Sequence, residues 1–401
     1  MPEPNADGSG ATPFARLVAC VALLWFAGIS LRLAMLAVPP LIRLIHDDLH
    51  MSETEVGILS GLPQVLFALA SVPGSLLIAR FGALPTLVAG LLMAAVASAL
   101  RGAAPNIWLL YAATIFTGFG IAVMQPALPP LVRAWLPERI GFGTAVYANG
   151  LLVGEILPVA LTLPLVLPLV GGSWRLAFVV WAIPCVAIAL AIMAFAPRAP
   201  AAAPTTARKW WPNWRNVLVW KLGLMFGSVN AVYFAANAFI PDYLHYTGQP
   251  ELISAALSAL NIGQLPASLI LLFVAGRLVG RAWPYLACGI LTLASLAGIL
   301  FGTGWVIVAW AGVLGFCGAA VLVFMLALPP LLSPPDDIHR TTAAMFTISY
   351  TCAVVVPVIS GLAWDLSAVP AAAFIPMALC PFVLMGLAPT IRVSARSARQ
   401  L

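Results

Sequence analysis

Long apolar runs separated by short polar or basic segments dominate the pattern of this chain. Twelve of the runs are long enough for a helix to cross the hydrocarbon core of a bilayer, which takes about 20 residues. They begin near Phe14, Glu55, Leu84, Trp108, Gly141, Trp174, Val217, Leu252, Trp283, Trp305, Thr341 and Val369. The pattern predicts an all-α membrane protein with twelve transmembrane helices and both termini on one side.

Composition agrees with a multi-pass protein in a lipid bilayer. Of the 401 residues, 62% are hydrophobic and only 8% are charged, whereas a soluble domain carries about 25% charged residues. The six cysteines lie in apolar runs without paired spacing, which argues against disulfides and metal ligation. The segment 46–50, which contains two histidines and two aspartates, is interpreted as a charged turn. No metal and no cofactor is therefore expected.

The basic residues indicate the orientation. Fifteen of the 19 fall on the side of the amino terminus, and only Arg43, Arg101 and Arg175 fall in the loops on the opposite side. Since cytoplasmic loops are enriched in Lys and Arg, both termini are predicted to be cytoplasmic. The charges are spread over many short loops and form no stripe, so nucleic acid is not an expected partner.

The chain divides into two similar halves. A disordered cytoplasmic tail (1–13) precedes a six-helix bundle (14–196), a basic cytoplasmic linker (197–216), a second six-helix bundle (217–390) and a basic tail (391–401). The sequence Ala-Leu-Pro-Pro-Leu at 127–131 recurs at 327–331, an offset of 200 residues. Parallel six-helix repeats are typical of secondary transporters whose substrate site lies between the halves. No nucleotide-binding loop is present in the sequence, so ATP-driven transport by this chain is not expected.

Several segments resemble the major facilitator superfamily and, within it, the cyanate permease and 2-nitroimidazole transporter family. The segments that carry the resemblance are 30–32, 118–137, 172–175, 233–234, 240–241, 261–266 and 350–357. The resemblance implies the major facilitator fold, transport by alternating access and a small anionic substrate bound near Arg32.

Arg32 is the first of two charges within predicted spans. It lies in the apolar run 17–44, roughly 24 Å along a helix from Arg16 and roughly 16 Å from Arg43. A charge at that depth costs at least about 2.5 kcal/mol unless it faces a wet cavity or an anion. A planar guanidinium suits a small planar anion such as a carboxylate, cyanate or nitrate. The alternative is a structural arginine that bridges helices.

Glu155 is the second such charge, roughly 21 Å along the fifth span from Gly141 and so at a similar depth to Arg32. The first and fifth helices belong to one half, so an Arg32–Glu155 pair is expected. We hypothesise that protonation of Glu155 releases Arg32 for an anion and so couples proton and anion movement. A permanently ionised structural partner is the alternative, because burial favours the neutral carboxyl while Arg32 favours the ionised one.

Polar side chains within the spans complete the candidate substrate site. They are Gln125, Tyr147, Asn149, Asn230, Tyr233, Asn237, Asn261, Gln264 and Tyr350. Asn230, Tyr233 and Asn237 share one helical face, and Tyr233 is close to the repeat position of Arg32, so the second half is expected to place a phenol opposite the guanidinium. The alternative for each is a hydrogen bond between helices.

The leading interpretation is a monomeric secondary active transporter, a symporter of a small organic or inorganic anion with protons as a possible coupling ion. Export of neutral or amphipathic drug-like compounds is the alternative within transport. An intramembrane enzyme or receptor is a third class, for which no catalytic constellation is visible. Seventeen of the 19 basic residues are arginine, which suggests a GC-rich bacterial genome and a multi-pass protein of the cell inner membrane.

Overall fold

The computed structural model describes residues 13–51, 53–197 and 209–391. All regular structure in these ranges is helical, and twelve helical segments within them are long and apolar enough to cross a membrane. The predicted all-α, twelve-span architecture is confirmed. Residues 1–12, 198–208 and 392–401, which belong to the predicted tails and linker, lie outside the described residues. The cytoplasmic location of the termini stays a prediction.

The helices of the first half differ in length, and three of its spans are interrupted. Their bounds are α1 Pro13–Leu33, α2 Ile42–Leu49, α3 Glu53–Phe81, α4 Ala83–Gly102, α5 Ile107–Met124, α6 Leu128–Trp135, α7 Ile140–Leu161, α8 Leu167–Leu169 and α9 Trp174–Phe195. Short helical turns join some of them: η1 Pro39–Leu41, η2 Gln125–Ala127 and η3 Thr162–Val166.

The second half is built in the same way. Its helices are α10 Val217–Tyr246, α11 Ile253–Ile262, α12 Gln264–Leu278, α13 Ala282–Phe301, α14 Trp305–Leu332, α15 Ile338–Ser367 and α16 Phe374–Leu387. The short turns are η4 Pro250–Leu252, η5 Pro335–Asp337, η6 Pro370–Ala373 and η7 Ala388–Thr390.

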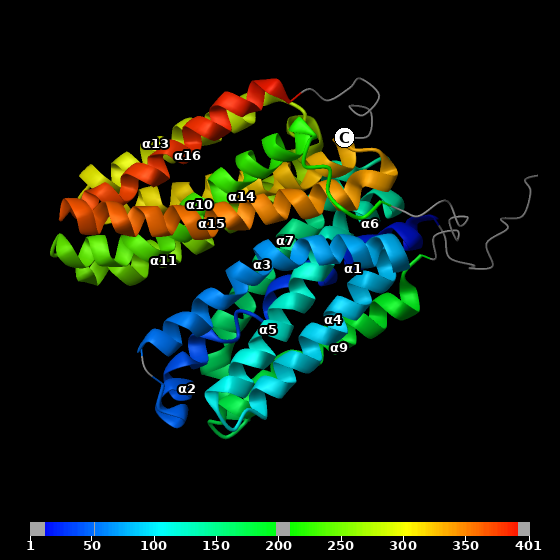
Figure 1. Ribbon diagram of the computed structural model, residues 1–401, viewed down its shortest axis with the longest axis horizontal. Coiled ribbons are helices and arrows are strands. Elements are labelled where there is room, and N and C mark those ends of the chain that lie inside the picture. Colours follow the sequence, from blue (N-terminus) through cyan, green and yellow to red (C-terminus); the bar gives the residue numbers. More distant parts are fainter. Residues whose placement is uncertain (1–12, 52, 198–208, 392–401) are drawn as a thin grey trace, which may run out of the picture.

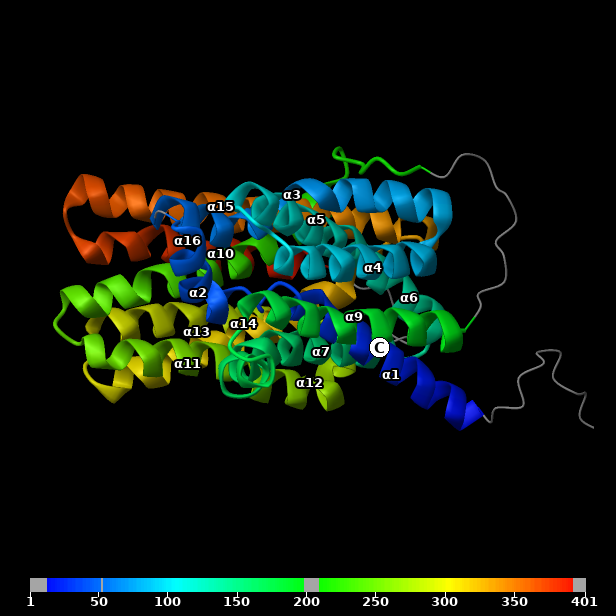
Figure 2. The ribbon, with the colours of Figure 1, turned by 90° about the horizontal axis from the view of Figure 1, so that it is seen from below.

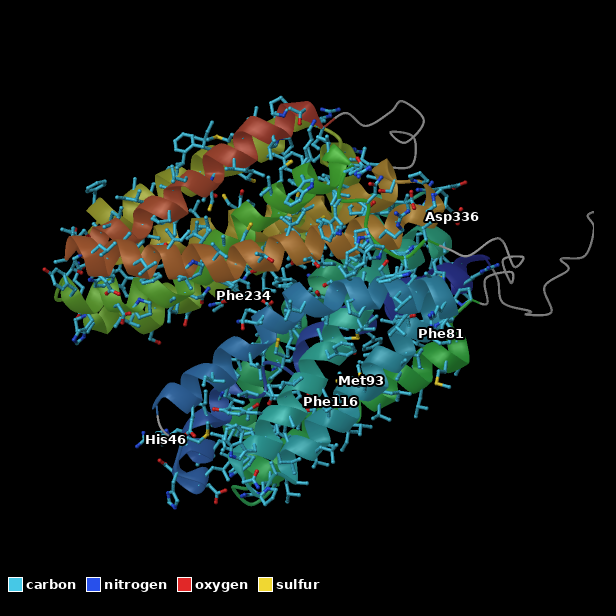
Figure 3. The ribbon with its side chains drawn as sticks, in the orientation of Figure 1. His46, Phe81, Met93, Phe116, Phe234 and Asp336 are labelled. Carbon is cyan, nitrogen blue, oxygen red and sulfur yellow. The ribbon has the colours of Figure 1, made fainter. Side chains whose placement is uncertain are left out.

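The two halves form two helical bundles arranged as a V (Figure 1). They meet at the end of the molecule from which α1 starts, which we call the joined end, and they diverge toward the other, splayed end. A view turned by 90° shows the helices of both halves running along the same long axis (Figure 2). Phe81 and Asp336, one from each half, lie at the joined end, and His46 lies at the splayed end (Figure 3). Contacts of α15 with α3, and of α7 with α12 and α14, hold the halves together.

The first helix ends earlier than the apolar run 17–44 predicts. Helix α1 stops at Leu33, and the backbone N–H groups of Met35 and Leu36 donate to the Arg32 carbonyl at 3.1 and 3.0 Å. Pro39 and Pro40, which start η1, lack the N–H donors that a continuous helix would need at these positions. Arg32 therefore lies in the last turn of α1, at a break in the span, and not in the middle of a continuous helix.

Close packing of α1 on α7 fixes the register of these two helices. A Cβ atom added to Gly154 would collide with the backbone carbonyl of Ile29, and one added to Gly28 would collide with that of Tyr147. Small residues at such crossings let helix backbones approach closely. Gly154 directly precedes Glu155, and Gly28 lies one turn before Arg32, so this packing brings the two charges to the same level.

Candidate functional site

Arg32 and Glu155 form an ion pair inside the first half. Arg32 Nε donates to Glu155 Oε1 at 3.0 Å, and the side chains are 10% and 17% exposed. The pairing expected from the sequence is therefore present. Because both side chains are largely buried, removal of either one would leave the other without its main compensating charge.

The guanidinium of Arg32 also reaches the second half. Its Nη2 donates to the Tyr350 hydroxyl at 3.2 Å, and Gln125 Nε2 donates to the same hydroxyl at 3.3 Å. The ring of Phe67 lies 5.5 Å from the guanidinium carbon. Nη1 is buried and has no hydrogen-bond partner among the described residues. The arginine thus has donor capacity that protein groups do not use.

A cavity of about 110 Å³ lies beside this ion pair, between the two halves. We call it the central cavity. Its lining comes from α1 and the chain that follows it, α3 and α7 in the first half, and α10, α12 and α14 in the second. The lining residues are Arg32, Met35, Leu36, Gln64, Leu151, Glu155, Val229, Asn230, Tyr233, Phe234, Gln264, Gly318 and Leu322. Phe234 lies between the two bundles in Figure 3.

The position of the central cavity along the molecule follows from the partners of Arg32. Tyr350 lies near the middle of α15, and Glu155 lies well inside α7. Although Arg32 ends its own helix, it therefore sits about half-way along the neighbouring spans. The break after α1 leaves room at this level for a cavity with two charged side chains in its wall.

At the joined end, Arg133 of α6 connects the two halves. Its Nη1 donates to the carbonyl oxygens of Pro330, in the last turn of α14, and of Ser333, which directly follows α14, at 2.6 and 2.9 Å. Charge-assisted hydrogen bonds are worth about 1.5 to 3 kcal/mol each when buried partners would otherwise be unsatisfied. They close the molecule on the side away from the splayed end.

The linker residues near the joined end also contact both halves. Ser75 Oγ of α3 donates to the Trp210 carbonyl at 2.7 Å, and Arg340 Nε of α15 donates to the Trp211 carbonyl at 2.9 Å. The described part of the linker is therefore packed across the joined end.

Comparisons with known proteins identify the family. The model of the Major Facilitator Superfamily matches residues 24–357. The chain belongs to this superfamily. It is 26% identical to the cyanate transport protein CynX of Escherichia coli (strain K12) over 343 residues, which cover 85% of this chain and 88% of CynX. It is 28% identical to the 2-nitroimidazole transporter of the same strain over 247 residues, 61% of this chain and 62% of that protein.

The same architecture occurs in solved structures of the superfamily. The crystal structure of the transporter FucP in the outward conformation aligns with a TM-score of 0.72 at 14% identity, covering 94% of this chain and 99% of FucP. At that identity the likeness concerns the fold. The expected major facilitator fold is confirmed, and this superfamily member is a transporter that spans the membrane many times.

Five of the candidate residues named from the sequence line the central cavity of this transporter. They are Arg32, Glu155, Asn230, Tyr233 and Gln264. Gln125 and Tyr350 lie directly behind the guanidinium, as their shared hydrogen bond shows. Asn230 donates to Ser349 Oγ at 2.7 Å, so this cavity-lining amide also ties α10 to α15.

Tyr233 and Arg32 line the same cavity from opposite halves, and the role of Tyr233 opposite the guanidinium stays a prediction. Tyr233 lines the cavity, but its hydroxyl donates to Asn261 Oδ1 at 2.6 Å, and Tyr350 provides the phenol that contacts the guanidinium. The direct contact with Tyr350 follows from the packing of α15 against α3, which repeat position did not indicate.

Four other candidates do not line the central cavity. Asn149 accepts from Trp25 Nε1 and donates to Ser268 Oγ, both at 2.9 Å, and so joins α1, α7 and α12. Asn237 donates to the Tyr233 carbonyl, and Asn261 accepts from the Tyr233 hydroxyl. Tyr147 is buried, and its hydroxyl has no hydrogen-bond partner in the described part of the chain. Asn237 Oδ1 also accepts from Asn261 Nδ2 at 3.4 Å, so for the three asparagines the alternative of hydrogen bonds between helices describes the contacts better.

Two polar residues were missed by sequence reasoning. Gln64 of α3 lines the central cavity and also a second one, of about 130 Å³, which we call the lateral cavity. Arg101 was assigned to an outer loop, yet it lies in the last turn of α4 and is only 1% exposed. The lateral cavity is lined by Met35, Leu36, Val38, Pro39, Leu59, Pro63, Gln64, Arg101, Thr114, Thr117 and Gly118. Gln64 could have been found as a polar residue within an apolar run. Nothing in the sequence distinguished Arg101 from an arginine in a loop.

Proposed function

We propose that this chain is a secondary active transporter of a small organic or inorganic anion, which binds to Arg32 in the central cavity. The observation that carries the proposal is a buried guanidinium in the wall of a cavity between the two halves, with its Nη1 unpaired among the described residues. An intramembrane charge of this kind is a functional candidate by default. Since both halves contribute to the cavity within one chain, the working unit is a monomer.

Anion recognition follows from the geometry of the guanidinium. Nε is engaged by Glu155 and Nη2 by Tyr350, so the donors of Nη1 and the second proton of Nη2 remain for a guest. These two nitrogens present parallel N–H groups, which match the two oxygens of a carboxylate or another small planar anion. Asn230, Tyr233 and Gln264 offer additional polar contacts from the second half.

Alternating access requires the halves to move against each other. We propose that residues 14–196 and 217–390 move as two bodies joined by the linker 197–216, with the Arg133 contacts broken when the joined end opens. The predicted cytoplasmic termini put the joined end on the cytoplasmic side, so the described state would accept substrate from outside the cell. The arginine-rich composition and the bacterial relatives support a location in the bacterial inner membrane.

Glu155 provides a route for proton coupling. While it is ionised, it occupies Arg32 Nε and offsets the positive charge that an anion needs. Protonation removes that competing charge, so anion binding and proton binding favour each other, as reciprocal linkage requires. This arrangement supports symport of the anion with a proton. A permanently ionised Glu155 would instead hold Arg32 in place without coupling.

The proposal is tested with purified protein in proteoliposomes. Entry of radiolabelled cyanate, nitrite and formate is measured with an acidic exterior and a neutral interior, and protein-free vesicles report leakage of the neutral acids. We expect at least one anion to enter faster than in the control vesicles and to be driven by the proton gradient. Entry at the control rate for every anion tested would reject the proposal.

A second candidate function is export of neutral or amphipathic compounds. It is favoured by a small, mainly apolar pocket in the second half, lined by Ser228, Val229, Val232, Tyr233, Leu260, Thr292, Leu314, Gly318, Pro381 and Leu384. Three of these residues, Val229, Tyr233 and Gly318, also line the central cavity. The similarity to a 2-nitroimidazole transporter supports this candidate as well.

Competition separates the two candidates. If the chain is an anion carrier, formate should inhibit entry of the labelled anion and 2-nitroimidazole should not. The opposite pattern, with 2-nitroimidazole moved by the protein and unaffected by formate, would favour the exporter.

A further inference from the structure

Arg101 is a second buried arginine, held at the end of α4. Its Nη2 donates to the Ala34 carbonyl and, at 2.9 Å, to Ser98 Oγ. The guanidinium carbon lies 4.7 Å from the centre of the Phe178 ring. Nε is buried and has no hydrogen-bond partner among the described residues. The hydrogen bonds of Nη2 therefore hold the guanidinium in place, while the Nε donor has no partner among the described residues.

No carboxylate balances this charge within the part of the chain that the structure describes. The ion pairs there join Arg32 to Glu155, Arg175 to Asp48 and Arg340 to Asp337, and none of them includes Arg101. A buried charge in the interior of a membrane protein normally pairs with an opposite charge or faces water. The carbonyl, the hydroxyl and the aromatic face offset part of the cost, but none of them carries a full negative charge.

The space beside Arg101 is large enough for a guest. The lateral cavity has a volume of about 130 Å³, enough for a small anion, and lies between α3, α4, α5 and the chain that follows α1. Its polar wall includes Thr114 and Thr117, whose hydroxyls donate to the backbone carbonyls one turn earlier. Those hydroxyl protons are already used, so Arg101 is the cationic donor in the wall.

The lateral cavity adjoins the central cavity. The two share Met35, Leu36 and Gln64 in their walls. Arg101 contacts the carbonyl of Ala34, two residues beyond Arg32. Helix α4 starts next to Phe81 at the joined end and runs toward the splayed end (Figure 3), so Arg101 is on the splayed side of Arg32.

We propose that Arg101 and the lateral cavity form a second anion-binding site, which takes a small, monovalent, weakly hydrated anion. The site has one cationic residue, which matches one negative charge. Most of its wall is apolar, so an anion that loses its hydration shell at low cost, such as nitrate, is favoured over sulfate or phosphate. Binding at this site does not require the transport function proposed for Arg32.

The test uses purified full-length protein and sodium nitrate as the probe. Thermal unfolding is followed in Arg32→Gln and in the double variant Arg32→Gln/Arg101→Gln, with sodium gluconate keeping the ionic strength constant. A ligand that binds only the folded state raises the melting temperature in a saturable way. We expect nitrate to raise the melting temperature of Arg32→Gln and not that of the double variant. Sodium sulfate at equal ionic strength is the control and should change the melting temperature of both variants equally.

A second variant keeps the test decisive if Arg101→Gln does not fold. Leu59 lines the lateral cavity but not the central one, so Leu59→Phe in the Arg32→Gln background fills the site while Arg101 keeps its contacts. The nitrate concentration that gives half of the maximal rise in melting temperature should increase about tenfold or more. An unchanged response in Leu59→Phe or in the double variant, or no nitrate response in Arg32→Gln, overturns the second site.

Failure of this site is distinguishable from failure of the proposed function. If Arg101 is only a latch for the Ala34 carbonyl, the nitrate response is absent from Arg32→Gln while transport by the wild type still depends on Arg32. If transport does not depend on Arg32 but the nitrate response depends on Arg101, the proposed function fails and the second site stands.

Discussion

Arg32 Nε and Glu155 Oε1 lie 3.0 Å apart in the wall of a cavity that both halves of the chain line. The pair belongs to one half, while Nη2 of the same guanidinium contacts Tyr350 in the other half. One residue thus connects a titratable carboxyl, the cavity and the partner half.

Replacement of Glu155 by glutamine should remove the pH dependence of transport. In the wild type, anion entry should rise as the external pH falls, because protonation of Glu155 frees Arg32. Glutamine is neutral at every pH, so entry into Glu155→Gln proteoliposomes should vary little between pH 5 and 8 and should not be driven by a pH gradient. If this variant transports with the wild-type pH profile, Glu155 is not the coupling residue.

Tyr350→Phe should slow transport without preventing anion binding. The hydroxyl links Arg32 and Gln125 to the second half, and its loss leaves two buried donors unsatisfied, a cost of about 1 to 3 kcal/mol. We expect the maximal rate to fall about tenfold, since 1.4 kcal/mol corresponds to a factor of ten.

Tyr147→Phe is the matched control, because the Tyr147 hydroxyl has no partner among the described residues. Its rate should stay within about twofold of wild type. Equal effects of the two substitutions would argue against a specific role for the Tyr350 hydroxyl.

Arg133→Ala should open the joined end. The substitution removes two hydrogen bonds between α6 and the end of α14. Spin labels at Phe81→Cys and Asp336→Cys, which lie in different halves at this end (Figure 3), should report a longer distance in electron double resonance. Arg139→Ala removes an exposed arginine of the same region and should leave the distance distribution unchanged. A shift of the same size in both variants would mean that general charge, and not the Arg133 contacts, keeps this end closed.

Gly154→Ala should destabilise the first half. A Cβ atom at this position would overlap the Ile29 carbonyl, so α1 and α7 must separate. Overpacking of this kind typically costs about 1 to 3 kcal/mol, and the melting temperature of the purified protein should fall.

Gly386→Ala provides the control, because nothing lies within 4 Å of an added Cβ at this helical position. It should have no effect or should stabilise slightly, since alanine favours a helix over glycine by about 1 kcal/mol. A Gly154→Ala variant as stable as Gly386→Ala would contradict the packing described for α1 and α7.

The sequence predicted the fold well, because each long hydrophobic run corresponds to a transmembrane span and the 200-residue repeat indicates two similar halves. It also predicted the Arg32–Glu155 pair, since two charges at similar depth in one half have few other partners. It did not predict that α1 ends at Leu33, because the apolar run continues through the break and only Pro39 and Pro40 mark it.

Contacts between the halves were harder to predict from the sequence. Which phenol meets Arg32 depends on how α15 packs against α3, and internal symmetry does not fix that packing. Arg101 illustrates a second difficulty. A basic residue at the end of an apolar run is usually a loop residue, and this one is buried by the packing of the broken first span and of α9 against α4.

The initial rate of anion entry into proteoliposomes containing wild type, Arg32→Lys or Arg32→Gln tests the central claim most directly, using the anion that the wild type transports best and equal amounts of folded protein. Arg32→Gln should fall to the rate of protein-free vesicles, and Arg32→Lys should retain a reduced rate, because it keeps the charge but loses the paired planar donors. Entry through Arg32→Gln at the wild-type rate would contradict the claim that Arg32 binds the transported anion.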